Sequence, residues 1–143
     1  MKFKCIIDPD CEEEVVVHAR ERSPLVEKLE KLVVGEALDP VGYDGSRIVP
    51  FRLCDVYCFF VEGGRVFALL ENERLLMKQR LYAIESGLGS DFVRINQSAI
   101  VRLDKIECFD ASLSGTLTVL LKNGHRDYVS RRQLKTVKER IGL

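Results

Sequence analysis

Apolar and polar residues alternate along much of this chain, a pattern typical of β-strands that bury one face. Two short strands are predicted near the N-terminus, at residues 2–8 and 14–19. Many more follow residue 40. These further strands are predicted at residues 41–43, 47–51, 55–61, 65–70, 74–77, 92–95, 99–103, 106–109, 116–122 and 125–129. The pattern therefore predicts a predominantly β chain.

Glycine-containing pairs between these strands predict tight hairpins. Asp44-Gly45 and Asn123-Gly124 are pairs that two-residue hairpin turns favour, because such turns need positive φ angles. A further glycine-rich turn is predicted at residues 62–64.

Two short helices are predicted in the first ninety residues. Ser23 and Pro24 suit the N-cap and the first helical position of one helix, which Gly35 is expected to end. The apolar stripe of this helix comprises Leu25, Leu29 and Leu32. The second helix is predicted near residues 78–86.

A third helix is predicted at the C-terminus. Ser130 is its expected N-cap, and Gln133 stands three residues later, as in a capping box. Its expected inward face comprises Leu134, Val137 and Ile141, and its outward face Lys135, Lys138 and Arg140. The helix is therefore basic on its exposed side.

Asp39-Pro40 marks a boundary between two parts of the chain. Residues 1–40 are expected to form a β-β-α extension, and residues 41–143 the main domain. A chain of 143 residues is long enough for one core with a small addition. Because the extension alone can bury little apolar surface, we expect it to dock on the main domain or on a second copy of the chain.

The composition of the chain indicates neither a membrane protein nor a secreted one. The chain is 46% hydrophobic, yet it contains no run of about 18 apolar residues that would suggest a membrane span. Its N-terminus becomes acidic too early for a signal peptide, so the expected location is the cytoplasm. Five cysteines, an odd number, then predict reduced thiols rather than disulfides.

The zero net charge conceals a division between the two parts. Residues 1–45 hold 6 Lys/Arg and 11 Asp/Glu, a net charge of −5. Residues 46–143 hold 16 Lys/Arg and 11 Asp/Glu, a net charge of +5. The basic excess therefore falls in the main domain, where it would attract phosphate.

Residues suited to catalysis or metal binding are scattered. His18 and His125 are the two histidines and lie in different parts of the chain. Cys54 and Cys58 fall in a predicted strand, where their spacing does not suit a metal ion. No enzyme activity, cofactor, metal or small-molecule substrate is expected.

Two polar stretches interrupt the apolar pattern of the main domain. Arg94, Asn96, Gln97 and Ser98 lie between strands, and their side chains are of the types that hydrogen-bond base edges or phosphates. The alternative interpretation is a tight turn, for which Asn and Ser are also suited.

The second stretch is Arg131-Arg132, in the first turn of the last helix. The helix dipole disfavours cations there, whereas an arriving phosphate would make them favourable. The alternative is a pair of solvated arginines. Lys135 is a further phosphate candidate, and Arg65 is either a contact or an ordinary cation at the end of a hairpin.

The residues from Phe92 to Val101, together with Tyr128-Val129-Ser130-Arg131-Arg132, resemble the LytTR-type DNA-binding domain of bacterial transcription regulators. The resemblance covers residues 41–143. It implies antiparallel β-sheets whose loops read the major groove of double-stranded DNA. The residues expected to contact DNA are Arg65, Arg94, Asn96, Gln97, Ser98, Arg131, Arg132 and Lys135.

Such a regulator is expected to act as a homodimer or on repeated sites. About 40 residues precede the domain, too few for a phosphoacceptor receiver domain. Regulation is then expected to come from the abundance of the protein, from oligomerisation, or from a separate partner such as a membrane protein. The competing hypothesis is a protein-interaction module whose N-terminal extension docks another chain.

Overall fold

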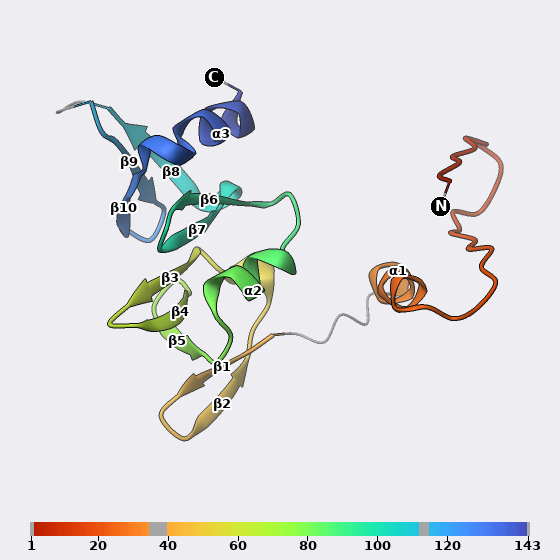
Figure 1. Cartoon of the computed structure of the whole chain (residues 1–143), viewed down its shortest axis with the longest axis horizontal. Helices are drawn as coiled ribbons and strands as arrows, with labels where there is room; N and C mark the ends of the chain where they lie inside the picture. Colours follow the sequence, from red (N-terminus) through yellow and green to blue (C-terminus); the bar gives the residue numbers. More distant parts are fainter. Residues whose placement is uncertain (1, 35–39, 112–114, 143) are drawn as a thin grey trace. The chain divides into compact units, whose positions relative to one another are not determined.

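The computed structural model describes residues 2–34, 40–111 and 115–142, and it divides the chain into two compact units. Unit 1 is Met1–Leu38 and unit 2 is Asp39–Leu143 (Figure 1). The two units are described separately below. Among the described residues, no helix is long and apolar enough to cross a membrane.

Unit 1 contains one helix, α1 (Pro24–Val34), which confirms the predicted start at Ser23-Pro24. The Ser23 hydroxyl oxygen accepts a hydrogen bond from the backbone N–H of Val26 at 3.3 Å, as an N-cap does. The predicted stripe is poorly covered, since Leu32 remains 77% exposed. Gly35, expected to end the helix, lies outside the described residues.

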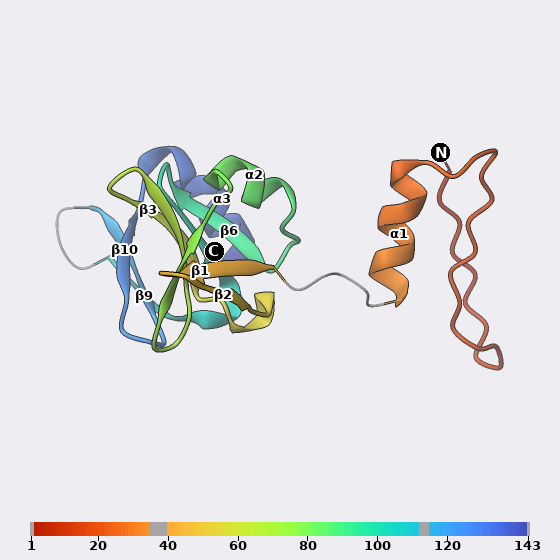
Figure 2. The same ribbon diagram turned by 90° about the horizontal axis from the view of Figure 1, so that it is seen from below.

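The two strands predicted in unit 1 are wrong. Residues 2–22 are all exposed, and none of them is in a strand. Residues 2–8 and 12–20 run as two extended stretches side by side, joined by a turn in which the Cys11 N–H donates to the Asp8 carbonyl (Figure 2). Two stretches without a covered apolar face lack the packing that stabilises a sheet.

Unit 2 is built on a seven-stranded antiparallel sheet with the order β2-β1-β5-β4-β3-β7-β6. Its strands are β1 (Val41–Asp44), β2 (Arg47–Pro50), β3 (Cys58–Glu62), β4 (Arg65–Leu69), β5 (Arg74–Met77), β6 (Phe92–Asn96) and β7 (Ala99–Arg102). The helix α2 (Leu81–Ser86) joins β5 to β6. The strand predicted at 55–61 begins later, because Leu53–Asp55 form a short 3-10 helix, η1.

A second, three-stranded antiparallel sheet has the order β10-β9-β8. Its members are β8 (Ile106–Asp110), β9 (Leu117–Leu121) and β10 (Arg126–Val129), and the 3-10 helix η2 (Leu103–Lys105) precedes them. The C-terminal helix α3 (Arg131–Ile141) follows β10 directly and contacts β6 and β10. The predicted mainly β fold with short helices is therefore confirmed for unit 2.

The buried side chains of unit 2 form two clusters. Phe59, Leu75 and Ile100 belong to a cluster inside the large sheet, covered by α2. Ile95 and Val137 belong to a second cluster, which fills the space between β6, the small sheet and α3. Val137 is fully buried, so its side chain anchors α3 beside the edge strand β6.

Candidate nucleic-acid interface

Three segments expected to contact DNA lie at one end of unit 2. The Val61 N–H, at the end of β3, donates to the Ser98 carbonyl at 2.9 Å. The Ser130 N–H, just before α3, donates to the Ile95 carbonyl at 2.8 Å. The β3–β4 hairpin, the β6–β7 turn and the start of α3 are therefore neighbours, although about seventy residues separate the first from the last.

The start of α3 is a positively charged helix N-terminus. The Ser130 hydroxyl oxygen accepts from the Gln133 N–H at 3.3 Å, which confirms the N-cap. The reciprocal half of the predicted capping box is replaced, since the Ser130 N–H donates to Ile95 instead. The first turn holds no acidic residue.

Arg131 and Arg132 are exposed in this first turn. Among the ion pairs of the described residues, none involves either arginine, so both charges stand against the positive end of the dipole without compensation. Lys135 is exposed one turn further along, four residues after Arg131 and thus on the same side of the helix. Together they form a basic edge that an anion would stabilise.

Gln97 and Ser98 form the tip of the β6–β7 turn, and both are exposed. The backbone N–H of Ser98 is held by the Asn96 side-chain oxygen at 2.8 Å. The hydrogen bond from Ser98 to Asn96 fixes the conformation of the turn, and the exposed Gln97 and Ser98 side chains lie beside the basic edge of α3.

Arg94 is placed differently from the expectation that it contacts DNA. Its guanidinium donates to the carbonyl of Asn96 at 3.1 Å and to that of Gln97 at 2.7 Å. It also forms an ion pair with Glu85 of α2 at 3.0 Å. Because the side chain is only 23% exposed and each of its three nitrogens makes a hydrogen bond within the domain, Arg94 supports the turn from behind.

Asn96 also departs from the expectation. Its side chain is 1% exposed, and its amide nitrogen donates to the Asp127 carboxylate at 3.0 Å and to the Tyr128 carbonyl at 2.9 Å. In this arrangement the amide faces the protein interior, away from any base edge. The local pattern could not reveal this, because both partners lie more than thirty residues away in sequence.

Arg65 is exposed at the start of β4, opposite Glu62 in the antiparallel register. Glu62 forms its ion pair with Arg74 rather than with Arg65. None of the ion pairs between described residues involves Arg65, which lies at the tip of the hairpin that adjoins the β6–β7 turn.

One exposed residue of β10, Tyr128, lies just before the basic edge and was not among the expected contacts. It is 52% exposed and lies two residues before the N-cap of α3. Arg126, two positions earlier on the same strand, is also exposed. The sequence signal that could have identified Tyr128 is the polar face of the strand leading into the arginine pair.

The buried cysteine nearby is chemically inert. Burial and, to a smaller extent, the negative charge of Asp127 raise the pKa of the Cys58 thiol to about 12. Cys58 therefore stays protonated at neutral pH and packs as an apolar side chain. The described residues contain no group of three or more side chains suited to holding a metal ion.

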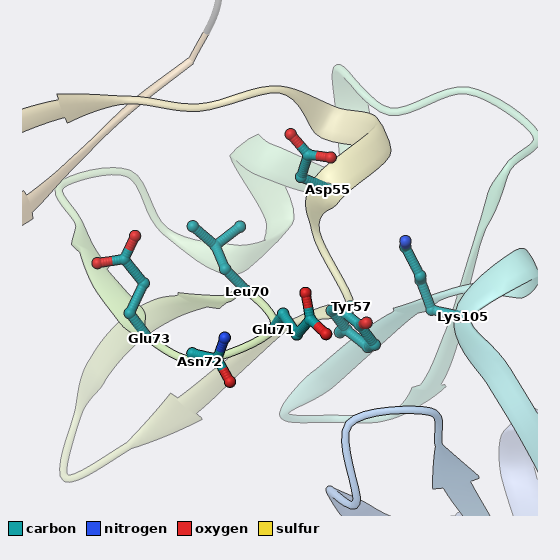
Figure 3. A pocket seen from close by; sticks show the side chains of 7 residues that line it. All are labelled: Asp55, Tyr57, Leu70, Glu71, Asn72, Glu73 and Lys105. Carbon is teal, nitrogen blue, oxygen red and sulfur yellow. The ribbon is translucent and has the colours of Figure 1, made fainter.

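A hollow of about 400 Å³ lies toward the other end of β3 and β4 (Figure 3). Its lining includes three carboxylates, and the Lys105 ammonium lies 4.9 Å from the centre of the Tyr57 ring. The residues that line it are Asp55, Tyr57, Leu70, Glu71, Asn72, Glu73 and Lys105. This acidic end is unsuited to a phosphate backbone, so the two ends of unit 2 differ in electrostatic character.

Comparison with known proteins agrees with this architecture. Residues 46–142 match the family model of the LytTr DNA-binding domain. An uncharacterized HTH-type transcriptional regulator of Staphylococcus aureus (strain NCTC 8325 / PS 47) is 37% identical over 103 residues, which cover 72% of this chain and 70% of the relative. The corresponding regulator of strain N315 matches equally well.

A solved structure from Bacillus cereus shares the fold. It is the LytTr DNA-binding domain of a putative methyl-accepting/DNA response regulator, with a TM-score of 0.68 and 19% identity. The similarity covers 73% of this chain and 96% of that domain. In unit 2 as described, the strands β6 to β10 separate α2 from α3, so these helices do not form the helix-turn-helix that the Staphylococcus names mention.

The matched residues span unit 2 from its first hairpin to the end of α3. They include the polar β6–β7 turn and the arginine pair on which the resemblance rested. The chain belongs to the LytTr DNA-binding domain family.

Proposed function

We propose that this protein is a sequence-specific transcription regulator that reads the major groove of double-stranded DNA through loops rather than through an inserted helix pair. One observation carries the proposal: Arg131 and Arg132 are exposed at the N-terminus of α3, with no ion pair to any described residue, beside the exposed Gln97-Ser98 turn. Both lie in the part of the chain with a net charge of +5.

The two elements supply different kinds of contact. Arginine pairs bidentately with guanine and glutamine with adenine, so Arg132 and Gln97 are the proposed base-reading residues. Arg131, Lys135 and the N–H groups at the start of α3 are the proposed phosphate contacts, because a helix N-terminus attracts anions. Arg65 adds a phosphate contact from the adjoining hairpin.

The direct test starts from a pool of random duplexes, from which the protein selects its binding sequence. Binding of the selected duplex and of an unrelated duplex is then measured at two salt concentrations. Arg132→Ala should weaken binding to the selected duplex by about 1–3 kcal/mol and relax selectivity at one base position, because a bidentate contact is lost.

Arg52→Ala is the matched control for this substitution. Arg52 is exposed and lies next to Leu53, whose carbonyl accepts a hydrogen bond from Arg102 at the far end of β7 from the turn. Arg52→Ala therefore removes one positive charge, as Arg132→Ala does, but at a position outside the proposed interface. Full specific affinity in Arg132→Ala would exclude the assigned base contact, and equal losses in the two variants would reduce it to a general charge effect.

Unit 1 is the proposed dimerisation element. A unit of fewer than about 40 residues usually needs a disulfide, a metal or a partner to be stable. The described cysteines of unit 1, Cys5 and Cys11, are free and exposed. Its large apolar side chains are also exposed, notably Phe3 at 93%, Ile7 at 86% and Leu32 at 77%.

A second copy of the chain would cover these side chains and would place two DNA-reading units on one DNA molecule. The alternative function, a protein-interaction module, rests on the same exposed residues. It requires that unit 1 binds a different protein and that the chain alone stays monomeric.

A further inference from the structure

The buried side chain of Asn96 joins the two sheets of unit 2. Asn96 ends β6, the edge strand of the large sheet, and its partners belong to β10, the edge strand of the small sheet. Its amide nitrogen donates to the Asp127 carboxylate and to the Tyr128 carbonyl, at 3.0 and 2.9 Å. Its amide oxygen accepts from the Ser98 N–H at 2.8 Å. One side chain therefore holds partners from both sheets.

Each of these bonds fixes one of the proposed DNA-contacting elements. The bond to the Ser98 N–H shapes the turn that displays Gln97, in the manner of an Asx turn. The bond to the Tyr128 carbonyl holds the strand end two residues before Ser130, the N-cap of α3. The turn and the arginine pair are thus attached to the same amide group.

We propose that Asn96 is a positioning residue, which sets the distance between the Gln97-Ser98 turn and the start of α3 so that both enter one groove in register. The inference rests on the proposed function. Base contacts require side chains to be held within about 0.5 Å of their productive positions. An amide with three short hydrogen bonds in a buried site can provide that restraint, because leaving its donors unpaired is costly.

Other hydrogen bonds between the two sheets remain when Asn96 is substituted. The Ser130 N–H still reaches the Ile95 carbonyl, and the Asn123 side-chain amide, at the turn after β9, still donates to the Leu70 carbonyl, just after β4, at 3.3 Å. The Asp127 carboxylate oxygen also accepts from the Tyr128 N–H at 2.8 Å, which holds it in place. A change at position 96 should therefore alter the spacing of the two elements before it unfolds the domain.

The test exchanges the two side chains. Asn96→Asp replaces both donors with an acceptor that faces Asp127, and it should lower the affinity for the selected duplex about 10- to 100-fold, the range expected when one base contact is lost. Asp127→Asn alone keeps an acceptor and should stay within about threefold of the unsubstituted protein. The double variant Asn96→Asp with Asp127→Asn restores a donor between the positions and keeps the original net charge. Because a carboxylate at position 96 cannot donate to the Tyr128 carbonyl, the double variant should recover part of the lost affinity, through the amide donor at position 127 alone.

The readout is the ratio of affinities for the selected and the unrelated duplex, since a change in net charge acts on both duplexes alike. Binding is measured below the thermal midpoint of every variant, so that loss of stability alone leaves the ratio unchanged. An unchanged ratio in Asn96→Asp, or a loss of which the double variant recovers no part, would overturn the positioning role. Absence of selectivity in the unsubstituted protein would overturn the proposed function as well.

Discussion

At the scale of single residues, the sequence pattern identified a candidate interface but did not distinguish its exposed side chains from the buried side chains that support them. Gln97 and Ser98 are exposed, whereas the neighbouring Asn96 is buried and Arg94 braces the turn against Glu85. All four are polar and lie within five positions, so their types alone indicate a turn or a contact equally well. Their orientation depends on Glu85 and Asp127, which only the folded chain brings near.

Cys58 gives a prediction at the same scale, since its pKa is raised to about 12 in the folded protein from an ordinary value near 9. Below pH 9 the thiol is neutral in both folded and unfolded chains, and its burial contributes fully to stability. As the pH rises from 9 toward 12, the unfolded chain loses this proton first, so the free energy of unfolding falls by up to about 1.4 kcal/mol per pH unit.

Urea unfolding of the protein and of Cys58→Val at pH 8 and pH 10.5 measures this contribution. Lysines and tyrosines titrate in both proteins, so the difference between their two pH dependences isolates the thiol. The variant should lose less stability than the unsubstituted protein over this interval. Equal losses would mean that Cys58 ionises normally and is accessible to solvent.

At the scale of elements, the apolar pattern predicted every strand of unit 2 within a few residues, because most of these strands bury side chains in a core. The same alternation failed at residues 2–8 and 14–19, where no core covers the apolar side chains. Alternation predicts a strand correctly only where the rest of the fold covers its apolar side chains, and the local sequence does not show whether such a cover exists. The N-cap of α3 was predictable because its signal, Ser130 followed by Gln133, is entirely local.

Two substitutions of Ser130, the N-cap of α3, should affect the stability of the domain and its affinity for DNA differently. Ser130→Ala removes the acceptor of the Gln133 N–H and should lower the free energy of unfolding by about 1 kcal/mol. Ser130→Asp keeps an acceptor and adds a charge that the helix dipole favours, so stability should be retained. That charge lies beside Arg131, where it should repel phosphate and weaken binding to any duplex.

Chemical denaturation and binding at low salt, measured on both variants, test this separation. Ser130→Asp should rank above Ser130→Ala in stability and below it in affinity for DNA. If Ser130→Asp were above Ser130→Ala in both stability and affinity for DNA, the start of α3 would not lie against the DNA backbone.

At the scale of the whole molecule, charge and exposed apolar side chains are distributed differently between the two units. Unit 2 carries the basic edge and matches the DNA-binding family almost from end to end. Unit 1 carries exposed apolar side chains and lies in the part of the chain with a net charge of −5. This arrangement suits a chain that reads DNA with one unit and pairs with the other.

Substitution of apolar residues in the full-length chain tests this assignment. Phe3→Asp combined with Ile7→Asp places charges where a second copy is proposed to pack, at side chains that are 93% and 86% exposed. Because these side chains contact little within the chain, unit 2 should keep its fold and its affinity for a duplex with one binding site. The molar mass in solution should fall from that of a dimer to that of a monomer.

Binding to duplexes with two sites then tests whether dimerisation strengthens DNA binding. A dimer binds its second site at a high effective concentration, so the unsubstituted protein should prefer the two-site duplex by about 100-fold or more. The doubly substituted variant should lose that preference. Lys2→Gln with Lys4→Gln makes the same change in net charge at two exposed neighbours and keeps the apolar side chains, so it is the control for altered charge. If the unsubstituted chain is monomeric and has no such preference, unit 1 is free to bind a different protein, and the interaction-module alternative is favoured.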